Sequence, residues 1–595
     1  MNGFFNRLLR IDLSGRSYRY EEIPDQVLAR TLGGKGLGTH LLWNEIPRGV
    51  SPLSPENKFI LAAGPVTGTS FWSQSRFGAY AKSPATGGFA EAYCGGSVAP
   101  KIKGCGVDAI IVEGAGDSLS FLIIDETGVE FADAEPIRGA DTVESEKYIL
   151  RKSPPGSGAV SIGPAGENLV AFACIKSDRW RSLGRCGLGA VLGSKKLKGI
   201  SFSGGRKAPL ADAPGLSELT REIMRRFKDS PVTTNYRRLG TPMQVVVTNT
   251  QNCFPTRYWS SGHMEGWEKI SADYMQTYFE VKPRACPNCF LMCTKLSTVK
   301  EGRHRGLVLE GPEYETIYAL GGLNAIDSLE EVAWLNDICD RLGLDTMSAG
   351  NMSGFAIEAR RRGKIGFDID YNQPDRTAEL FRMIARREGI GEILGKGIKS
   401  AAAELGLEDL AIHVKGLEPA GFDPRVLKGM ALSYATSARG ACHLRGTFYK
   451  AELTGQVDRD VIPGKAAKQI DYEDRSALFD CLILCRFFRD FIQWEEIGAL
   501  IRTTTGLSFD KAGLELFAND LTERTRAYNR REGLGAETDT LPWRFLNEKT
   551  VEGASLSATD LETMIGEYNL IRSSRSEEYE RRMKSGRPDR QAGTA

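Results

Sequence analysis

Three closely spaced cysteines carry the clearest chemical signal in this chain. Cys286, Cys289 and Cys293 follow a C-x-x-C-x-x-x-C pattern, and three thiolates at this spacing can surround one metal centre. Two further cysteines, Cys481 and Cys485, lie far downstream and four residues apart, so we expect one helix face to present both. Since a cubane [4Fe–4S] cluster takes one thiolate per iron, the sequence predicts such a cluster with a remote fourth ligand.

Two other interpretations of the cysteines remain open at this stage. A zinc site with four cysteine ligands usually pairs two C-x-x-C knuckles, whereas the second pair here has C-x-x-x-C spacing. Disulfide bonds are typical of secreted scaffolds, and three thiols this close together in a long chain fit that class poorly. The iron–sulfur interpretation therefore leads.

Length and charge exclude several classes of protein. The chain has 595 residues, which suggests two to four domains, and its 77 Lys and Arg balance 76 Asp and Glu to a net charge of +1. No global field would recruit nucleic acid or an acidic membrane. Arg7, Arg10 and Asp12 interrupt the apolar core that an export signal needs, and no apolar run is long enough for a membrane span. With twelve cysteines, these features predict a cytoplasmic protein.

Residues 1–210 read as a sheet domain. Short apolar segments alternate with glycine-rich segments, as in strands joined by turns. The expected strands are residues 58–63, 109–113, 119–124 and 159–162. The glycine clusters at 33–38, 95–96 and 184–194 match neither G-x-G-x-x-G nor the phosphate loop, so a Rossmann nucleotide site is not expected. Their backbone N–H groups, with Arg76, Arg181 and Arg185 nearby, suit phosphate.

From residue 211 onward the apolar periodicity turns helical. Ser328 and Glu331 form a capping-box pattern, and the helix they begin should end at Gly343. This helix brings Asp340 and Asp345 to its C-terminal end, where the helix dipole disfavours carboxylates. The N–H donors of a bound heterocycle would compensate. We also expect two helices in residues 375–408 and a frayed, charged tail over residues 573–590.

The predicted fold class is α+β, with an N-terminal β-sheet domain as the base for a cofactor and two mainly α-helical domains after it. The predicted domains are residues 1–210, residues 211–415 with the cysteine triplet, and residues 416–595 with the fourth cysteine and the charged tail.

Acid–base chemistry has few candidate residues. The chain has five histidines, too few for a histidine-rich metal site. His443 follows a polar run that contains Arg439 and Cys442 and suits proton transfer. Glu313 and Glu315 come soon after the cysteine triplet, so they are expected near the metal centre. No G-x-S-x-G or H-E-x-x-H motif occurs, which excludes serine hydrolase and zinc protease chemistry of those types.

Taken together and in order, these motifs resemble the tungsten-containing aldehyde:ferredoxin oxidoreductase family over nearly the full length. The resemblance implies a tungsten ion, or less favourably molybdenum, held by the dithiolene sulfurs of two pterins, with Mg²⁺ bridging the pterin phosphates and a [4Fe–4S] cluster nearby. The segments that carry it are residues 32–37, 64–69, 76–84, 184–198, 286–293, 311–316, 340–345 and 480–485.

The resemblance also assigns residues to these groups. The implied cluster ligands are Cys286, Cys289, Cys293 and Cys485. The implied cofactor-binding residues are Arg76, Tyr93, Gly95, Gly96, Arg185, Cys186, Gly187, Asp340, Gly343, Leu344, Asp345, Asp480 and Leu484. Backbone carbonyls around Tyr93 and Cys186 would bind Mg²⁺, although the family has Asn where this chain has Tyr93.

For catalysis, the resemblance implies a glutamate and a histidine beside the metal. His443 is the histidine, and either Glu313 or Glu315 is the glutamate. The expected reaction oxidises a small aldehyde to a carboxylic acid, with electrons passing through the cluster to ferredoxin or to an iron–sulfur partner subunit. Trp259, Tyr314 and Phe448 are aromatic candidates for the pocket wall.

Two alternative functions stay open. Relatives of the benzoyl-CoA reductase catalytic subunit run the metal reductively inside a larger complex and use a cysteine ligand on tungsten, for which Cys253 and Cys442 are the candidates here. From another class comes a non-catalytic iron–sulfur electron-transfer protein. Residues 305–412 contain no histidine, so the E-x-x-H motif that holds a dimer-bridging iron in archaeal members is missing. A homodimer without this iron stays open as an alternative to the monomer.

Overall fold

The computed structural model describes residues 1–584, and its N-terminal third contains two six-stranded mixed sheets. The first sheet has the order β2-β1-β6-β3-β4-β5, in which β1 and β6 are parallel and the other pairs antiparallel. Its strands are β1 (Arg7–Asp12), β2 (Ser17–Glu22), β3 (Phe59–Ala62), β4 (Arg76–Lys82), β5 (Phe89–Gly95) and β6 (Ala109–Glu113).

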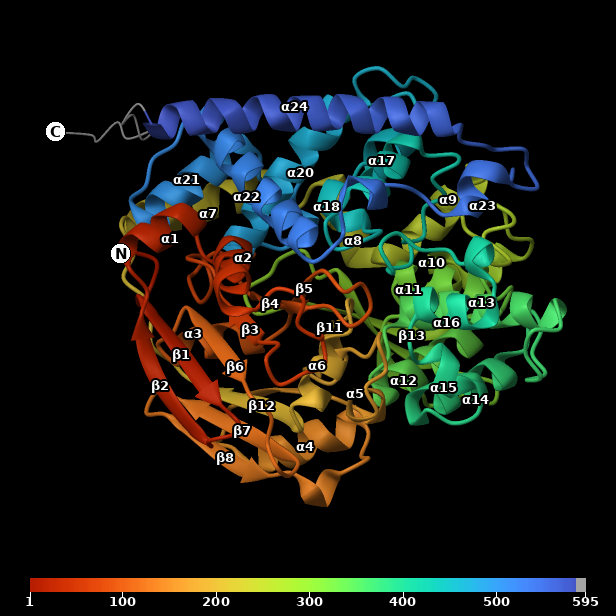
Figure 1. The fold of residues 1–595 in the computed structure, drawn as a ribbon, viewed down its shortest axis with the longest axis horizontal. Helices are drawn as coiled ribbons and strands as arrows, with labels where there is room; N and C mark the ends of the chain where they lie inside the picture. Colours follow the sequence, from red (N-terminus) through yellow and green to blue (C-terminus); the bar gives the residue numbers. More distant parts are fainter. Residues whose placement is uncertain (585–595) are drawn as a thin grey trace.

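The second sheet has the order β11-β10-β9-β12-β7-β8, with β7 and β12 parallel. Its strands are β7 (Ser120–Asp125), β8 (Val129–Asp133), β9 (Gly158–Ser161), β10 (Ile175–Ser177), β11 (Arg181–Leu183) and β12 (Leu197–Ser203). Alternate residues of both sheets, such as Phe59 and Leu61 from one and Leu122 and Ile200 from the other, enter one shared core with helices α3 (Val98–Gly104) and α6 (Leu188–Ser194). The two sheets therefore form one base (Figure 1).

The opposite face of the first sheet is covered by α1 (Asp25–Thr31) and α2 (Gly34–Glu45). The glycine cluster at 33–38 belongs to α2, and its glycines permit close packing. A Cβ on Gly34 would lie 2.1 Å from the backbone oxygen of Asp480, and one on Gly38 would lie 2.5 Å from the Tyr80 ring. These glycines bring the end of a distant helix onto the sheet, which positions Asp480.

A third sheet lies in the region that the sequence predicts as helical. Strands β13 (Phe279–Arg284), β14 (Thr294–Val299) and β15 (Val308–Glu310) pair in antiparallel order. Arg284 pairs with Thr294, so residues 285–293, with all three clustered cysteines, form the connecting hairpin loop. The cysteine spacing is thus presented by a hairpin rather than by a helix.

Helices make up most of the remaining chain. In Figure 1 α24 (Ala558–Lys584) crosses the top of the molecule, above α20 (Lys465–Leu482) and α22 (Lys511–Arg531). The large buried core of this part takes residues from both sides of position 415. The other long helices are α4 (Thr142–Lys152), α7 (Ala213–Phe227), α8 (Pro231–Leu239), α12 (Leu329–Leu342), α13 (Thr346–Arg361), α14 (Pro374–Arg386), α17 (Lys428–Thr436) and α21 (Trp494–Thr505). In the described residues, no helix is both long and apolar enough for a membrane span.

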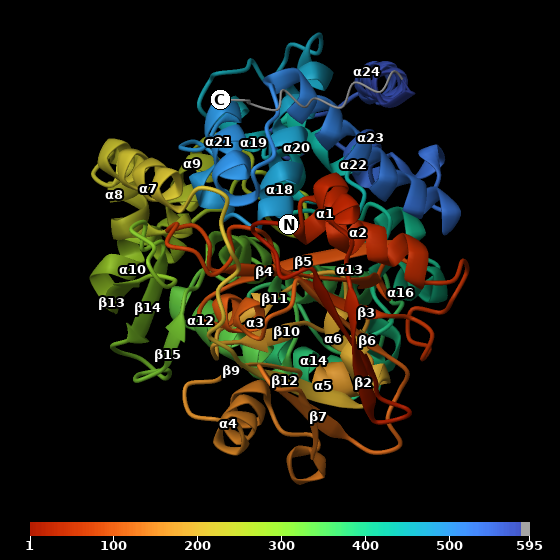
Figure 2. The same ribbon diagram turned by 90° about the vertical axis from the view of Figure 1, so that its left-hand side faces the viewer.

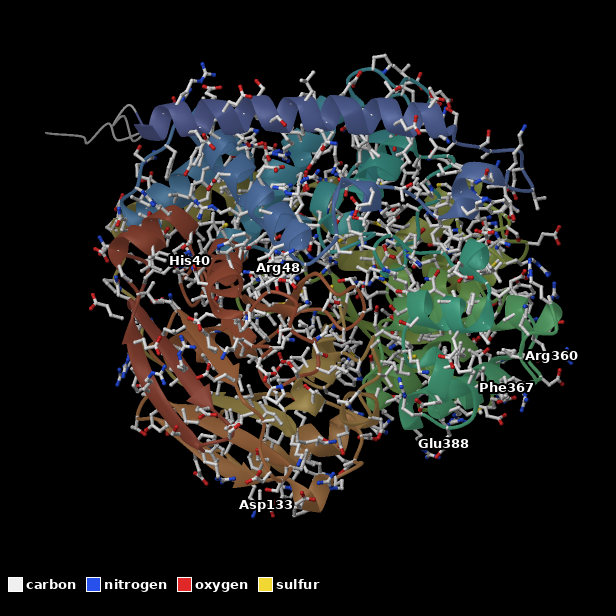
Figure 3. All side chains as sticks on the ribbon, in the orientation of Figure 1. His40, Arg48, Asp133, Arg360, Phe367 and Glu388 are labelled. Atoms are coloured by element: carbon white, nitrogen blue, oxygen red, sulfur yellow. The ribbon has the colours of Figure 1, made fainter. Side chains whose placement is uncertain are left out.

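Figures 2 and 3 show how this helical part lies against the sheets. In Figure 2, α10 (Ala272–Tyr278) lies between α8 and the three-stranded sheet, and it contacts both. Figure 3 labels Asp133 at the lower edge, at the end of β8 in the second sheet, and Arg360 and Glu388 on the outer side of the lobe formed by α12 to α16 (Ile398–Leu405). The predicted site residues meet in the interior, between the sheets and the helical part.

The α+β fold is confirmed, and several local predictions can be checked against it. The four expected strands correspond to β3, β6, β7 and β9. Ser328 caps α12 by accepting from the Glu331 N–H, but the Glu331 carboxylate pairs with Arg303 and His304, so the reciprocal half of the capping box is not formed. Gly343 ends this helix at φ 76°. Residues 375–408 contain three helices, with α15 (Ile390–Leu394) unexpected.

The prediction of a frayed tail is wrong for its first part, because α24 continues through Lys584. Arg572 of this helix is buried and pairs with Asp474 at 2.6 Å and Glu473 at 2.8 Å. These buried ion pairs hold α24 on α20 and explain why a charged segment stays helical. Residues 585–590 of the predicted tail lie outside the described residues. The domain boundaries at 210 and 415 remain predictions.

Candidate active site

The predicted site residues meet around two adjoining cavities between the sheets, the cysteine hairpin and the helices. The larger cavity has a volume of about 400 Å³ and the smaller one about 160 Å³. Predicted residues that line the larger cavity are Arg76, Tyr93, Gly95, Cys293, Glu313, Tyr314, Glu315, Asp340, Leu344, Asp345 and His443. Predicted residues that line the smaller one are Arg76, Tyr93, Arg185, His443, Asp480 and Leu484.

The hairpin loop holds its three thiols against the first sheet. A Cβ on Gly95 would lie 3.3 Å from the Cys286 sulfur, so only glycine leaves the thiol its full space. Burial raises the pKa of Cys289 to about 12, and the backbone N–H groups of Leu291 and Met292 partly counter this by donating to its sulfur. Burial, and next the neighbouring Cys485, raise the pKa of Cys293 well above its usual range.

Cys485 lies beside this hairpin and Cys481 does not. Helix α20 ends at Leu482, and Ile483 turns the chain through a left-handed conformation (φ 56°), so the two cysteines do not share a helix face as the sequence suggested. The Cys485 sulfur lies 3.7 Å from Arg76 Nη1. The Cys481 thiol faces Gly36 of α2 instead. The structure thus brings Cys485, and not Cys481, to the three clustered thiols.

Two arginines supply positive charge to the thiols. Arg76 lies near Cys485, Cys94 and Cys286, and Arg181 lies near Cys286 and pairs with Glu310 at 2.9 Å. In residues 1–584 no three His, Cys, Asp or Glu side chains converge tightly enough for one metal ion. A cubane spreads its ligands over four irons, so four cysteines spaced around such a cluster with flanking arginines remain a chemically suitable set.

Asp340 meets a lysine that the sequence analysis missed. Lys176 of β10 donates to Asp340 Oδ1 at 2.6 Å, and Asn336 donates to Oδ2 at 3.1 Å. Burial raises the Asp340 pKa, and Lys176 works against that shift. Gly343 lets the helix end pass over the second sheet, because a Cβ there would lie 2.9 Å from the Gly163 nitrogen.

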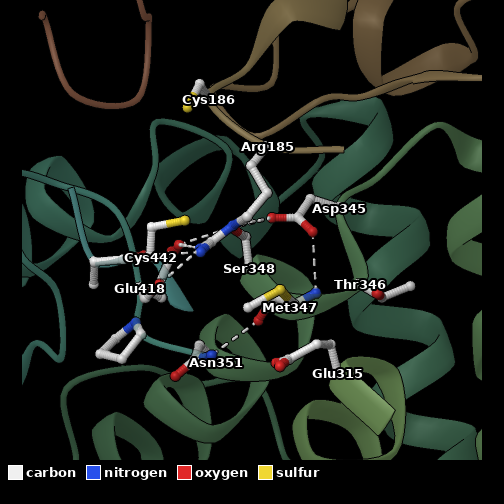
Figure 4. A network of polar contacts seen from close by, with 12 residues as sticks. Arg185, Cys186, Glu315, Asp345, Thr346, Met347, Ser348, Asn351, Glu418 and Cys442 are labelled. Atoms are coloured by element: carbon white, nitrogen blue, oxygen red, sulfur yellow. Dashed lines mark hydrogen bonds and ion pairs between the residues drawn. The ribbon is translucent and has the colours of Figure 1, made fainter. Parts of the chain in front are cut away.

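Asp345 begins α13 and binds Arg185, as Figure 4 shows. Arg185 Nε lies 3.2 Å from Asp345 Oδ2, and Ser348 donates to the same oxygen at 2.9 Å. Arg185 also donates to the backbone oxygens of Glu418 at 2.8 Å and Ala441 at 3.2 Å. The arginine expected at a pterin phosphate is therefore fixed by three chain segments, which contain Asp345, Glu418 and Ala441.

Asp480 belongs to a buried ion network on the smaller cavity. Arg486 Nη2 lies 2.5 Å from Asp480 Oδ2, and Arg445 contacts the same oxygen. Arg445 also pairs with Glu91 at 2.9 Å. Leu484 is buried and lines this cavity. The sequence pattern identified Asp480 but not the two arginines, whose only signal was a position close to an already chosen motif.

The carbonyls proposed for Mg²⁺ already accept hydrogen bonds. Arg76 donates to the Tyr93 oxygen at 3.1 Å, and Ser83 donates to the Cys186 oxygen at 2.9 Å. The Tyr93 hydroxyl donates to Glu91 at 2.7 Å. Each carbonyl retains one lone pair, so Mg²⁺ binding stays a prediction.

Gly96 and Gly187 have left-handed backbones, with φ 113° and 75°. A Cβ on Gly96 would lie 2.1 Å from the Asp178 carboxylate, and one on Gly187 would lie 2.1 Å from the Ala171 oxygen. Both glycines are therefore required by close packing. Neither lines the two cavities.

Glu315 and His443 face each other across the larger cavity. His443 Nε2 lies 3.4 Å from Glu315 Oε1, and the Gly421 N–H donates to Glu315 Oε2 at 3.0 Å. Burial raises the pKa of Glu315 to about 8. Burial and then Arg439 lower the His443 pKa well below its usual range. At neutral pH the pair is a carboxylic acid beside a neutral imidazole.

Glu313 occupies a different wall. Thr241 donates its hydroxyl to Glu313 Oε2, and the carboxylate lies near the Cys293 thiol. His443 therefore pairs with only one of the two candidate glutamates, and Nδ1 of its ring has no hydrogen-bond partner among the described residues. A buried imidazole nitrogen without a partner is consistent with a ligand or water in the cavity.

The two candidate thiol ligands differ sharply. Cys253 is fully buried in the core near Thr248, and burial raises its pKa. Cys442 accepts from Arg439 Nη2 at 2.9 Å. Burial opposes ionisation there too, but nearby arginines outweigh it and lower the Cys442 pKa to about 7. Figure 4 shows Cys442 beside Arg185. Of these two thiols, only Cys442 has a lowered pKa, which favours its thiolate form.

Aromatic rings enclose the acid–base pair. Phe422 and Tyr449 stack with ring centroids 4.0 Å apart, and both rings lie about His443 at 6.0 and 6.2 Å. Tyr314 also lines the cavity. The other two predicted aromatics are absent from its lining: Trp259 is buried and donates to Asn351, and Phe448 packs against Tyr472.

The residues present fit the implied cofactor. Two cavities flanked by buried Asp, Lys and Arg side chains suit a charged heterocycle with phosphates. Two guanidinium nitrogens there, Nε of Arg439 and Nε of Arg445, lack hydrogen-bond partners within the described residues, and such buried donors are expected to meet a ligand.

The chain is similar to known proteins over nearly its whole length. Residues 8–204 match the N-terminal domain, and residues 218–573 match domains 2 and 3, of aldehyde ferredoxin oxidoreductase. The chain belongs to the aldehyde ferredoxin oxidoreductase family. It is 34% identical to the tungsten-containing aldehyde ferredoxin oxidoreductase of Pyrococcus furiosus and 33% identical to that of Thermococcus kodakarensis, with 96% of each chain covered. The prediction of an enzyme of this family is confirmed.

Two further matches are less similar in sequence. A Pyrococcus furiosus aliphatic sulfonate oxidoreductase, WOR-like subunit, is 29% identical over 74% of this chain and 75% of its own. The solved active site complex BamBC of benzoyl coenzyme A reductase superposes with a TM-score of 0.81 over 100% of both chains, at 21% identity. That second likeness shows the shared fold. Family membership leaves no support for a non-catalytic iron–sulfur protein.

Proposed function

We propose that this protein oxidises aldehydes to carboxylic acids with a tungsten bis-pterin and a [4Fe–4S] cluster. The observation that carries the proposal is the Glu315–His443 pair at 3.4 Å, which faces the same cavity as Cys293. The cluster ligands would be Cys286, Cys289, Cys293 and Cys485. Asp340, Asp345 and Asp480, with their cationic partners, would hold the pterins.

The chain's own residues would manage protons and orientation. When bound, the metal cofactor supplies the two-electron redox chemistry of the reaction. His443, held neutral, would donate a hydrogen bond to the aldehyde oxygen. Glu315 would take a proton from the attacking water after it has lost its own, which happens above about pH 8. Phe422 and Tyr449 would exclude bulk water from the pair.

Electrons would leave where the hairpin reaches the surface. Ala285, Pro287 and Asn288 are exposed beside the half-buried Cys286 and Cys289. A small one-electron carrier such as ferredoxin, or an iron–sulfur partner subunit, would dock over this loop. A cytoplasmic location and a homodimer without a bridging iron stay predictions, as does tungsten in place of molybdenum.

A reductive role is the second candidate, and Cys442 is the observation that favours it. Its thiol has the lowered pKa that a metal ligand needs, and the fold is shared with the benzoyl coenzyme A reductase complex. A reductive subunit acting on an acyl-CoA would use the same cavities with electrons entering through the cluster.

Elemental analysis with an activity assay separates these candidates. Anaerobically purified protein should contain about one tungsten and four irons per chain and should reduce viologen with aldehydes. The same metals without aldehyde activity would favour the reductive role. Zinc in place of both metals would overturn the cofactor assignment.

A further inference from the structure

A third cavity of about 370 Å³ lies beside the proposed active site and has no role in the chemistry above. It is enclosed by α19 (Tyr449–Leu453), α20 and the segment that follows Cys485. Five cationic side chains line it, and Asp490 is the one carboxylate among its described lining residues. The cations are Lys450, Lys468, Arg475, Arg486 and Arg489.

The positive charge is only partly neutralised within the chain. Lys450 pairs with Asp490, and Arg475 pairs with Asp471 at 3.0 Å. Neither Lys468 nor Arg489 has a carboxylate partner at ion-pair distance in the part of the chain that the structure describes. Arg489 donates instead to the Tyr449 hydroxyl at 3.1 Å. The cavity therefore retains an excess of cationic donors.

Buried donors in the wall lack partners. Arg486 is only 5% exposed and spends Nη2 on Asp480, while its Nε and Nη1 have no hydrogen-bond partner among the described residues. Nε of Arg475 is also buried without a partner. Unpaired buried N–H groups on a guanidinium are costly, and an anion in the cavity would satisfy them.

The cavity adjoins both parts of the active site. Arg489 lines this cavity and the larger one, and Arg486 lines this cavity and the smaller one. Tyr449 joins the two sides, because its hydroxyl meets Arg489 and its ring lies 6.2 Å from the His443 ring. A molecule whose reacting carbon lies at His443 could place a charged tail among these cations.

We propose that this cavity is a subsite for a phosphate group carried by the substrate. Lysine and arginine donors on several sides match the oxygens of a phosphoryl dianion, and the planar guanidinium groups suit bidentate contact. The inference rests on the proposed function, because it assumes that the reacting carbon lies at the Glu315–His443 pair.

Direct binding tests the subsite without any aldehyde activity. Inorganic pyrophosphate is titrated calorimetrically into the holoenzyme and into its Lys468→Gln and Arg475→Gln variants. The matched control is Lys399→Gln, an exposed lysine on α16 away from the cavity. Each cavity variant should weaken binding about tenfold, as expected for one lost charge-assisted hydrogen bond. Unchanged binding in both cavity variants would overturn the subsite.

A kinetic comparison identifies where the phosphate comes from. The ratio of kcat/KM for glyceraldehyde 3-phosphate to that for glyceraldehyde should fall about tenfold in Arg475→Gln, through KM. If pyrophosphate binding weakens and this ratio does not change, the ligand is free phosphate and the substrate-tail inference is wrong. An enzyme without aldehyde activity fails only this second assay, so the failure of the proposed function is recognised separately.

Discussion

Burial disfavours the charged forms of titratable groups at both ends of the larger cavity, but the two ends differ in what surrounds these groups. At the cysteine end, burial raises the pKa of Cys289 and Cys293, so these thiols ionise only with cationic help from arginines or a metal. At the other end, burial keeps Glu315 protonated and His443 neutral. At the cysteine end, a bound group must balance the charges of the thiolates. At the acid–base end, Glu315 and His443 stay uncharged until a proton is transferred.

This contrast separates electron transfer from proton transfer within one space. Arg76 and Arg181 lie near the thiols at the cysteine end, whereas Phe422 and Tyr449 enclose the acid–base end. Changes at the first end should remove metal and electrons together. Changes at the second should leave the metals in place and slow the chemistry.

The largest effect is expected from Cys289→Ser and Cys485→Ser. Each removes one thiolate from a four-ligand set, so iron content and viologen reduction should both be lost. Iron analysis and electron paramagnetic resonance of the reduced protein measure this. Cys481→Ser is the matched control, since its thiol faces Gly36 on α2. Retention of four irons by Cys485→Ser, or their loss only in Cys481→Ser, would reassign the fourth ligand.

His443→Asn should slow turnover while tungsten and iron contents stay normal. A positioned general acid or base contributes about 10²- to 10⁴-fold, so kcat should fall in that range. The control is His304→Asn, because His304 stacks on Trp334 and pairs with Glu331 away from the cavity. Wild-type kcat in His443→Asn would remove the histidine from the mechanism.

The sequence predicted some residues of the two ends and missed others. The cysteine triplet was recognisable because metal ligation needs thiols at fixed spacing along the chain. Lys176, Arg445 and Arg489 were missed, because they reach the site from separate elements and no local pattern links them to Asp340, Asp480 or Tyr449. Only tertiary packing creates those pairs.

The secondary structure, too, was predicted only in part from the sequence. Strands such as β3 and β6 have continuous apolar runs because both faces are buried. Strand β13 carries exposed charged residues, and β13 and β14 surround a cysteine loop, so their sequence did not separate them from the helical region. Glu313 and Glu315 were equally credible from spacing, and the 3.4 Å contact to His443 favours Glu315 as the catalytic glutamate.

Glu315→Gln against Glu313→Gln tests that choice through the pH profile. If Glu315 must lose its proton, kcat should rise with pH through about 8 in the wild type, its pKa in the folded protein. Glu315→Gln should lose most of its activity and the rise of kcat with pH, whereas Glu313→Gln should keep that rise. Stopped assays from pH 6 to 9.5 on metal-counted enzyme measure both. If kcat of Glu315→Gln still rises with pH in the same way, a group other than Glu315 is the base.

The smallest effect concerns stability. The Glu315 pKa is about 8 in the fold and 4.5 in its ordinary state, so between these values the native state binds more protons than the unfolded state. Stability from this group is therefore full below about pH 4.5 and declines as pH rises towards 8. Glu315→Gln keeps the uncharged shape and removes this decline. Thermal unfolding of wild type and Glu315→Gln at pH 5.5 and pH 8.5 should show the variant losing less stability between the two. An equal loss in both proteins would mean that Glu315 is already ionised in the fold, and the acid–base end would then be charged like the cysteine end.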